Sequence, residues 1–193
     1  MFYQPKDGHG LPHNPFYAVV TPRPIGWIST KGPQGCNLAP YSFFNAVASD
    51  PPQVMFASNG VKDTLHNIRA TGVFAVNVVS AALIDAMNQT SAKLPLGTDE
   101  FTHAGIARSD CRTIACVYVT KSPAVLECRM TQILPLEGVD NFLVIGAVTG
   151  IHIDDGCLND GRLDVTRFQP VARLGYQDYT IIDRVFALNR PKS

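Results

Sequence analysis

The sequence predicts a mainly β protein whose strands close, or nearly close, into a barrel. Short runs rich in β-branched and aromatic residues recur along the 193 residues, and Pro, Gly or Asn bounds them. Few segments show helical periodicity, and many short antiparallel strands with few helices favour a barrel. No repeat or linker divides the chain, whose length suits one hydrophobic core, so we predict a single domain over residues 1–193.

Six strands follow from this patterning. The four short ones are expected at Phe16–Thr21, Ile25–Thr30, Gln53–Ser58 and Phe74–Val79. In Leu126–Leu134, apolar and polar residues alternate, with Leu126, Cys128 and Met130 on one face and Glu127, Arg129 and Thr131 on the other. This alternation predicts a strand with one buried side.

The longest expected strand is Phe142–Asp154. One side carries Leu143, Ile145, Ala147, Ile151 and Ile153. Gly146 and Gly150 interrupt the other side, where bends or close backbone contacts often require glycine.

Two short helices are expected between the strands. Asp63 is a suitable cap for a helix that ends near Gly72, and Ser80 for a second helix with an apolar stripe. That stripe consists of Leu83, Ile84 and Met87. Residues 90–112 are polar and irregular, and we expect an insertion or lid there.

Composition excludes several classes of function. The formal net charge is zero, which does not favour nucleic acid as a partner, and the longest apolar runs are too short for a membrane span. The first ten residues lack the pattern of a signal peptide. The five cysteines are odd in number and form no CxxC, so we expect a reduced, cytoplasmic setting. Cys128 is expected in the core and Cys36 at the surface.

Residues 21–64 contain the richest cluster of polar and small side chains. A predicted strand leads into Ser58, Asn59, Lys62, Asp63 and Thr64 at an expected helix start, where hydroxyls, N–H groups and one ammonium suit a phosphate. The same residues also suit an ordinary turn and a capped helix, and spacing alone favours that simpler interpretation.

Flavin mononucleotide (FMN) would satisfy both the polar and the apolar parts of this segment. Its phosphate needs cations and N–H donors such as Lys62 and Arg23, and its ring needs an edge that excludes water. Asn37, Leu38, Ala39, Pro40 and Ser42 would form such an edge. The chain has no GxGxxG, GxxxxGK[ST], GxSxG or HExxH motif, and the His9 and His13 pair lacks a carboxylate that would complete a metal site, so no metal is expected.

Several motifs in order resemble those of the flavin reductase-like family with the FMN-binding split barrel. They are PRPIGWIST, GCNLAPYSFFN, DPP and KDT, with HGLPHNPF upstream and FLVIGAVTGIHID and RLGYQDYTIIDRVFALNRP downstream. The resemblance spans nearly the whole chain. It implies a Greek-key-like split β-barrel with a few short helices, and FMN as the cofactor.

By this resemblance, the ring and ribityl chain would contact Ser29, Thr30, Asn37, Leu38, Ala39, Ser42 and Asn45. The phosphate would contact Ser58, Lys62, Asp63, Thr64 and Arg23. Because a carboxylate repels phosphate, Asp63 is expected to cap the helix and orient Lys62. The resemblance also implies a homodimer with flavin near the interface, in which Arg173 or Tyr179 reaches the partner's site.

The reaction implied is NAD(P)H:flavin reduction, with reduced flavin supplied to an acceptor or a partner monooxygenase. No catalytic residue is assigned. Many such reductases carry Gly-Asp-His before the penultimate long strand, whereas residues 138–141 here are Gly-Val-Asp-Asn. His13 and His152 are possible substitutes, although packing is the simpler role for His152. The alternatives are an FMN-binding electron-transfer or flavoprotein oxygenase-like module without efficient NAD(P)H turnover, and a non-catalytic barrel.

Overall fold

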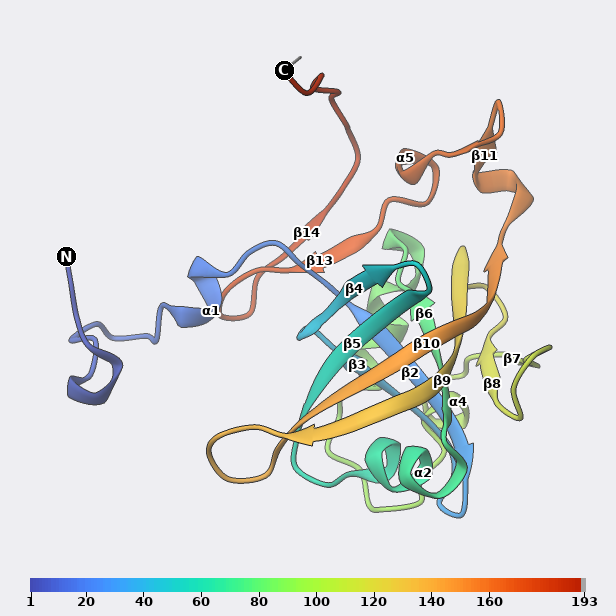
Figure 1. The fold of residues 1–193 in the computed structure, drawn as a ribbon, viewed down its shortest axis with the longest axis horizontal. Helices are drawn as coiled ribbons and strands as arrows, with labels where there is room; N and C mark the ends of the chain where they lie inside the picture. The colour runs from blue at the N-terminus through green and yellow to red at the C-terminus, as the bar shows by residue number, and fades with distance from the viewer. Residues whose placement is uncertain (192–193) are drawn as a thin grey trace.

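The computed structural model describes residues 1–191, and its main element is a seven-stranded antiparallel sheet in the order β3-β2-β6-β9-β10-β5-β4 (Figure 1). The chain forms hairpins from β2 and β3, from β4 and β5, and from β9 and β10. These strands are β2 (Gly26–Gly32), β3 (Gly35–Tyr41), β4 (Phe44–Ser49), β5 (Pro52–Asn59), β6 (Val73–Val78), β9 (Ala124–Pro135) and β10 (Asn141–Ile153). The prediction of a mainly β protein is confirmed.

The sheet curves until its two edge strands approach each other. β3 and β4 follow one another in the chain and are separated only by Ser42 and Phe43. The backbone N–H of Ala57 in β5 donates to the carbonyl of Phe43 at 2.8 Å, and β3 contacts β5 directly. A seam between β3 and β5 therefore runs along one side of the barrel.

The interior of the barrel is filled by large apolar side chains. Ile28, Phe56 and Phe74 are fully buried in one cluster, and helix α2 (Asp63–Thr71) covers one end of the barrel (Figure 1). A Cβ added at Gly146 would lie 2.5 Å from Cζ of Phe74. The expectation of close backbone contact at this glycine is therefore confirmed.

Smaller elements surround the barrel. The additional strands form three small sheets: β1 (Arg23–Pro24) with β13 (Val171–Arg173) and β14 (Tyr179–Ile181), β7 (Arg108–Asp110) with β8 (Val117–Val119), and β11 (Leu158–Asn159) with β12 (Arg162–Leu163). The other helices are α1 (Phe16–Val19), α3 (Ile84–Gln89), α4 (Glu100–His103), α5 (Val165–Phe168) and the 3₁₀ turns η1 (Pro5–Asp7), η2 (Ala81–Leu83) and η3 (Asp155–Cys157). Within residues 1–191, none of these helices has the length and apolar character needed to cross a bilayer.

The strand predicted at Phe16–Thr21 is wrong, because Phe16–Val19 forms helix α1. Its first N–H, from Phe16, donates to the side chain of Asn14 at 3.0 Å. The guanidinium of Arg23 donates to the carbonyls of Tyr17 and Val20 at the other end. The side chains of Asn14 and Arg23, on either side of α1, thus stabilise one helical turn in a sequence with high β propensity.

The two helix starts lie where the sequence places them, but the predicted side-chain caps are wrong. Asp63 is the first residue of α2 rather than its cap, and its Oδ2 accepts from the N–H of Gly97 at 2.9 Å. Ser80 precedes η2 and α3 without a side-chain capping bond, since it is buried in a backbone bridge to Pro170. Gly72 ends α2 with a left-handed φ of 72°, as expected from its glycine.

The two long strands differ in part from their predicted faces. Cys128 is fully buried, as expected, but Glu127 on the predicted polar face is fully buried as well. In β10 the core side carries Val144, whereas Ile151 on the opposite side is 58% exposed. The pairing of β10 with β9 shifts register between Val148 and Gly150, and such a bulge redirects the side chains that follow.

The segment 90–112 is more ordered than the expected insertion. It contains α4 and β7, and Phe101 is buried in a second apolar cluster with Trp27 and Val119. Thr90 accepts a hydrogen bond from the indole N–H of Trp27 at 2.9 Å. The segment is therefore attached to the barrel through its own core.

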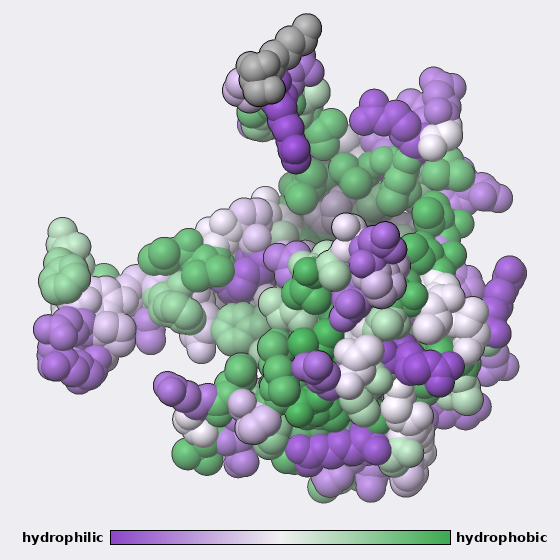
Figure 2. All heavy atoms as spheres, viewed as in Figure 1, coloured by the Kyte–Doolittle hydropathy of each residue, from purple (hydrophilic) through white to green (hydrophobic). Residues whose placement is uncertain are grey.

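The two ends of the chain extend away from the barrel (Figure 1). Apolar side chains lie at the surface of both extensions, as Figure 2 shows. Phe2 is 89% exposed, Val19 77%, and Phe186 86%.

Candidate functional site

A cavity of about 430 Å³ opens at the seam of the barrel. Its walls come from β3, the Ser42–Phe43 connection, the end of β5, the start of α2, residues 90–96 and Glu100. Because β3 and β5 belong to opposite ends of the sheet, the curvature of the barrel creates this site.

Six of the residues predicted for the site line this cavity, namely Asn37, Ala39, Ser42, Lys62, Asp63 and Thr64. Thr64 Oγ1 donates to Oδ1 of Asn37 at 2.5 Å, which links α2 to β3. The amide nitrogen of Asn37 in turn donates to both carboxylate oxygens of Glu100 at 3.0 Å. These hydrogen bonds fix the orientation of the wall between the helix and the sheet.

Glu100 is a buried carboxylate at this cavity that the sequence did not single out. Its Oε2 also accepts from the backbone N–H of Leu38 at 3.1 Å. Burial raises the pKa of Glu100, and the hydrogen bonds from Leu38 and Asn37 oppose only part of that rise. Leu38, predicted to contact the ring, is fully buried and does not line the cavity, and its backbone N–H serves to hold Glu100.

Asp63 and Tyr41 bring unpaired polar atoms to the cavity wall. Oδ1 of Asp63 and the hydroxyl of Tyr41 are buried and have no hydrogen-bond partner within the described residues. Burial raises the pKa of Tyr41. Buried polar groups in native proteins are almost always satisfied, so these two atoms suit a polar ligand.

Lysines supply the positive charge of the cavity. Lys62 stands immediately before α2, and Lys93 lines the cavity from the segment 90–96. Lys93 was missed because the segment was interpreted as an insertion or lid and no contact with the seam was inferred from it.

Four further predicted residues point elsewhere. Ser29 donates to the carbonyl of Val117 at 2.7 Å, and Thr30 accepts from the side chain of Asn67 at 3.1 Å. Ser58 is buried and bonds to the carbonyl of Gly60 at 3.0 Å. Asn45 is exposed on β4 and bonds to its neighbouring backbone. None of the four lines the seam cavity.

Neither of the two predicted arginines lines the seam cavity. Arg23 is buried and donates to the carbonyl of Leu174 at 2.7 Å, and burial and the nearby Arg173 lower its pKa. Arg173 donates to the hydroxyl of Tyr179 and lines a cavity of about 170 Å³ together with Ser42. Since Ser42 belongs to both cavities, Arg173 is adjacent to the seam site.

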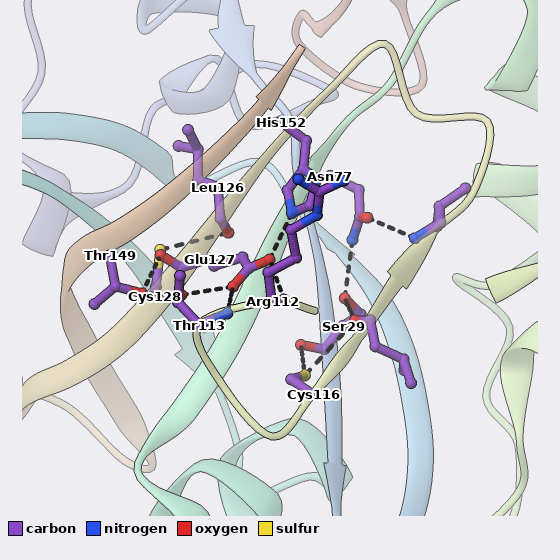
Figure 3. A network of polar contacts seen from close by, with 12 residues as sticks. Ser29, Asn77, Arg112, Thr113, Cys116, Leu126, Glu127, Cys128, Thr149 and His152 are labelled. Atoms are coloured by element: carbon purple, nitrogen blue, oxygen red, sulfur yellow. Dashed lines mark hydrogen bonds and ion pairs between the residues drawn. The ribbon is translucent and has the colours of Figure 1, made fainter. Parts of the chain in front are cut away.

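A second polar cluster lies away from the seam, around Glu127 (Figure 3). The buried carboxylate accepts from the N–H of Arg112 at 2.7 Å, from the N–H and hydroxyl of Thr113 at 2.6 Å, and shares a short contact with His152. Burial alone would raise the pKa of Glu127, but these donors outweigh it and lower the pKa to about 2. The ring of His152 also packs on Tyr118, with centroids 4.7 Å apart.

Comparison with known proteins gives the class of this fold and site. The model of the flavin reductase like domain matches residues 18–174, so the chain belongs to the flavin reductase-like family. A protein with a split barrel domain from Shewanella frigidimarina superposes with a TM-score of 0.81 at 22% identity, covering 91% of this chain and 90% of that one. The predicted split barrel is confirmed.

Relatives with higher sequence identity to this chain indicate its class of activity. An uncharacterised protein of Deinococcus radiodurans is 36% identical over 187 residues, covering 90% of this chain and 82% of its own length. Component B of nitrilotriacetate monooxygenase from Bacillus cereus superposes with a TM-score of 0.85 at 27% identity, over 94% of this chain and all of that one. A 2-nitrobenzoate 2-nitroreductase of Pseudomonas fluorescens superposes with a TM-score of 0.82 at 28% identity, covering 91% of this chain and 88% of that one. The family and these relatives define a flavin-related oxidoreductase.

Proposed function

We propose that the seam cavity binds FMN and that the protein is an NAD(P)H:flavin reductase that supplies reduced flavin to an acceptor or a partner monooxygenase. The observation that carries the proposal is the meeting, in one cavity, of lysines, a helix start, unpaired polar atoms and an apolar wall. The volume of about 430 Å³ lies within the usual range for small-molecule sites.

The start of α2 suits the phosphate. Lys62 brings a charge to the free N–H groups of its first turn, and Lys93 adds a second ammonium from another wall of the cavity. The hydroxyl of Thr64 donates to Asn37, so Thr64 would contact the phosphate through its backbone N–H. Gly60 precedes them with a φ of 87°, a backbone conformation that favours glycine at this close turn. We propose these residues as the phosphate subsite.

The unpaired Asp63 oxygen suits a different part of the ligand. A carboxylate accepts hydrogen bonds and repels phosphate, so Oδ1 of Asp63 is better matched to a hydroxyl of the ribityl chain. Asn37 and Ser42 are proposed for the same chain and the ring edge. Ala39, Pro40 and Leu94 provide the apolar wall that would exclude water from the ring.

When bound, FMN would supply the two-electron chemistry, since no side chain of this cavity transfers hydride. The protein's part is to orient the ring and keep water from it. Lysine and N–H donors near the bound ring system would stabilise negative charge. We therefore assign binding roles in the cavity and no acid–base triad.

The assembly we propose is a homodimer, in the cytoplasm. Its support is the apolar surface of the two terminal extensions (Figure 2). Val19 and Phe186 are among the exposed apolar residues there. In such a dimer Arg173 or Tyr179 would reach the partner's site. The similarity to component B of a monooxygenase supports a partner oxygenase as the acceptor. Light scattering on the purified protein will give its mass in solution, and a monomer would contradict the dimer.

A specific residue favours a second function, an FMN-binding electron carrier without efficient NAD(P)H turnover. Asn141 occupies the place of the family's histidine. Its Oδ1 accepts from the side chain of Asn59 at 3.2 Å, and Asn59 lines the cavity. The site thus has a neutral amide next to Asn59, and a reductase would need to position the nicotinamide without that imidazole.

One experiment separates the two functions. The purified protein is loaded with FMN and mixed with excess NADH or NADPH without oxygen, while the flavin absorbance is followed. We expect the absorbance of the bound, oxidised flavin to disappear after NADH or NADPH is added. Flavin that binds but stays oxidised would overturn the reductase and leave the carrier, and a protein that binds no FMN would overturn both.

A further inference from the structure

Two cysteines face each other across the β7–β8 hairpin. The last pair of this ladder is Asp110 with Val117, so Cys111 and Cys116 occupy the next opposing positions. The N–H of Cys111 donates to the carbonyl of Cys116 at 2.9 Å. Directly opposed residues have Cα atoms about 4.5–5.5 Å apart, which lies within the range of about 4.4–6.8 Å that a disulfide spans.

The loop between the two cysteines is held in place from outside. The buried carboxylate of Glu127 accepts from the backbone N–H groups of Arg112 and Thr113, at 2.7 and 2.6 Å (Figure 3). The hydroxyl of Thr113 adds a further bond to the same carboxylate. The loop therefore holds the two cysteines opposite each other without a covalent bond. Forming a disulfide between them would require little movement of the backbone.

Small molecules can reach this pair. Cys111 and Cys116 both line a surface cavity of about 530 Å³ that also includes Lys31 and Gly32 at the end of β2. Cys111 is half-buried and Cys116 is 3% exposed. The residues that line this cavity are different from those of the seam cavity.

We propose that Cys111 and Cys116 form a redox-active dithiol, which a peroxide converts to an intramolecular disulfide. One thiol attacks the peroxide, breaking its O–O bond, so that a sulfenic acid forms and one water leaves. The second thiol then attacks the sulfenic sulfur, the S–O bond breaks, and a second water leaves. Two thiols and one hydrogen peroxide thus give one disulfide and two waters, and a thiol reductant reverses the oxidation.

Either thiol of the pair can attack first, since the reaction needs only that the second lies opposite it. Cys111 is half-buried, whereas Cys116 is 3% exposed and its thiol donates to the carbonyl of Ser29 at 3.5 Å. Two of the other cysteines are less suited, because Cys36 pairs with Lys31 and Cys128 with Phe74 and Val148 in their ladders, so neither faces a second thiol.

The test is a thiol count and a peptide map after treatment with hydrogen peroxide. We expect the wild-type mass to fall by two hydrogens, two thiols to resist alkylation in denaturant, and the crosslink to join Cys111 to Cys116. Dithiothreitol should restore all five thiols. The Cys36→Ser variant is the matched control and should lose two thiols in the same way.

Single variants test the pairing. In Cys111→Ser and in Cys116→Ser no intramolecular disulfide should form, and dimedone should label the cysteine of the pair that remains. A crosslink to another cysteine, sulfinic acid without a disulfide, or no loss of thiols in the wild type would overturn the proposal. The wild-type map decides the matter even if a variant fails to fold. The assay needs no flavin, so its failure would leave the proposed FMN function unaffected.

Discussion

Glu100 at the seam cavity and Glu127 in the cluster with Arg112, Thr113 and His152 are both buried, but their electrostatic environments are opposite. Glu100 accepts from a side-chain amide and one backbone N–H beside an open cavity, and its pKa is raised. Glu127 accepts from two backbone N–H groups, a hydroxyl and an imidazole, and its pKa is lowered to about 2.

The difference shows that the donors around a carboxylate, rather than burial itself, decide which of its charge states the fold favours. Three of the four Glu127 donors come from Arg112 and Thr113 in one loop, so its charge is part of the structure. Both oxygens of Glu100 accept hydrogen bonds, but the cavity that Glu100 lines also holds two unpaired polar atoms, of Asp63 and Tyr41. This contrast supports the proposal that a ligand binds at the seam, where polar atoms are left without partners.

The largest effect is expected on stability, when the carboxylate of Glu127 is removed. Glu127→Ala leaves the N–H groups of Arg112 and Thr113 buried without an acceptor, and we expect a loss of about 3–5 kcal/mol in the free energy of unfolding. Urea denaturation followed by tryptophan fluorescence will measure it. The matched control is Glu137→Ala on an exposed loop, expected within about 0.5 kcal/mol of wild type. Equal stability of the two variants would contradict the role of Glu127.

The pH dependence of stability sharpens the comparison. The folded pKa of Glu127, about 2, lies below its ordinary value of 4.5, so its stabilisation is fully present above pH 4.5 and is lost as the pH falls toward 2. We expect this contribution to be about 3 kcal/mol. Unfolding free energies of wild type and Glu127→Gln, measured from pH 7 to pH 3, should converge at low pH. Parallel curves would show that the carboxylate is not stabilised in the folded state.

At the seam, a change should affect binding more than stability. Lys62→Ala removes one cation from the proposed phosphate subsite, and we expect FMN affinity to fall about 10–150-fold, since hydrogen bonds to charged groups contribute about 1.5–3 kcal/mol. Riboflavin, which lacks the phosphate, should bind the variant and the wild type alike. Flavin fluorescence titration measures both ligands, with Lys121→Ala as the control. An equal loss for FMN and riboflavin would place Lys62 outside the phosphate subsite.

The smallest effect is expected for Glu100→Gln. Burial raises the pKa of Glu100 because it penalises the charged form, and neutral glutamine removes that charge while keeping an acceptor for Asn37. We expect the unfolding free energy at pH 7 to change by less than about 1 kcal/mol, in either direction. Urea denaturation of Glu100→Gln and Glu127→Gln in parallel compares the two sites directly. A larger loss of unfolding free energy for Glu100→Gln than for Glu127→Gln would contradict the difference between the two environments.

Local pattern was sufficient to predict five strands of the seven-stranded sheet, although not β3 or β4, and the start of the seam site. The run from Asn37 to Ser42 and the residues around Lys62 are close in space because β3 and β5 meet, and the family motifs indicated both. Asp63 was placed at the right helix start with the wrong partner, since its acceptor role depends on Gly97, which is distant in the chain.

The remainder depends on contacts that local pattern does not specify. Glu127 alternates with apolar neighbours, as an exposed residue would, and only the loop at Arg112 and Thr113 makes its burial favourable. Ser29 has the chemistry of a ligand contact, yet its hydroxyl is used by the carbonyl of Val117. Lys93 reaches the seam because its segment is anchored by Thr90 and Phe101.

The order of strands in the sheet also has a consequence for how the molecule folds. Its three hairpins join chain neighbours, but the pairing of β5 with β10 brings together Asn59 and Asn141, which are 82 positions apart. Loop-closure entropy makes such pairings slow, and β-rich domains dominated by them fold in roughly milliseconds to seconds. The seam can form only after these distant strands have paired, so the ability to bind a ligand should arise late in refolding, after the hairpins have formed.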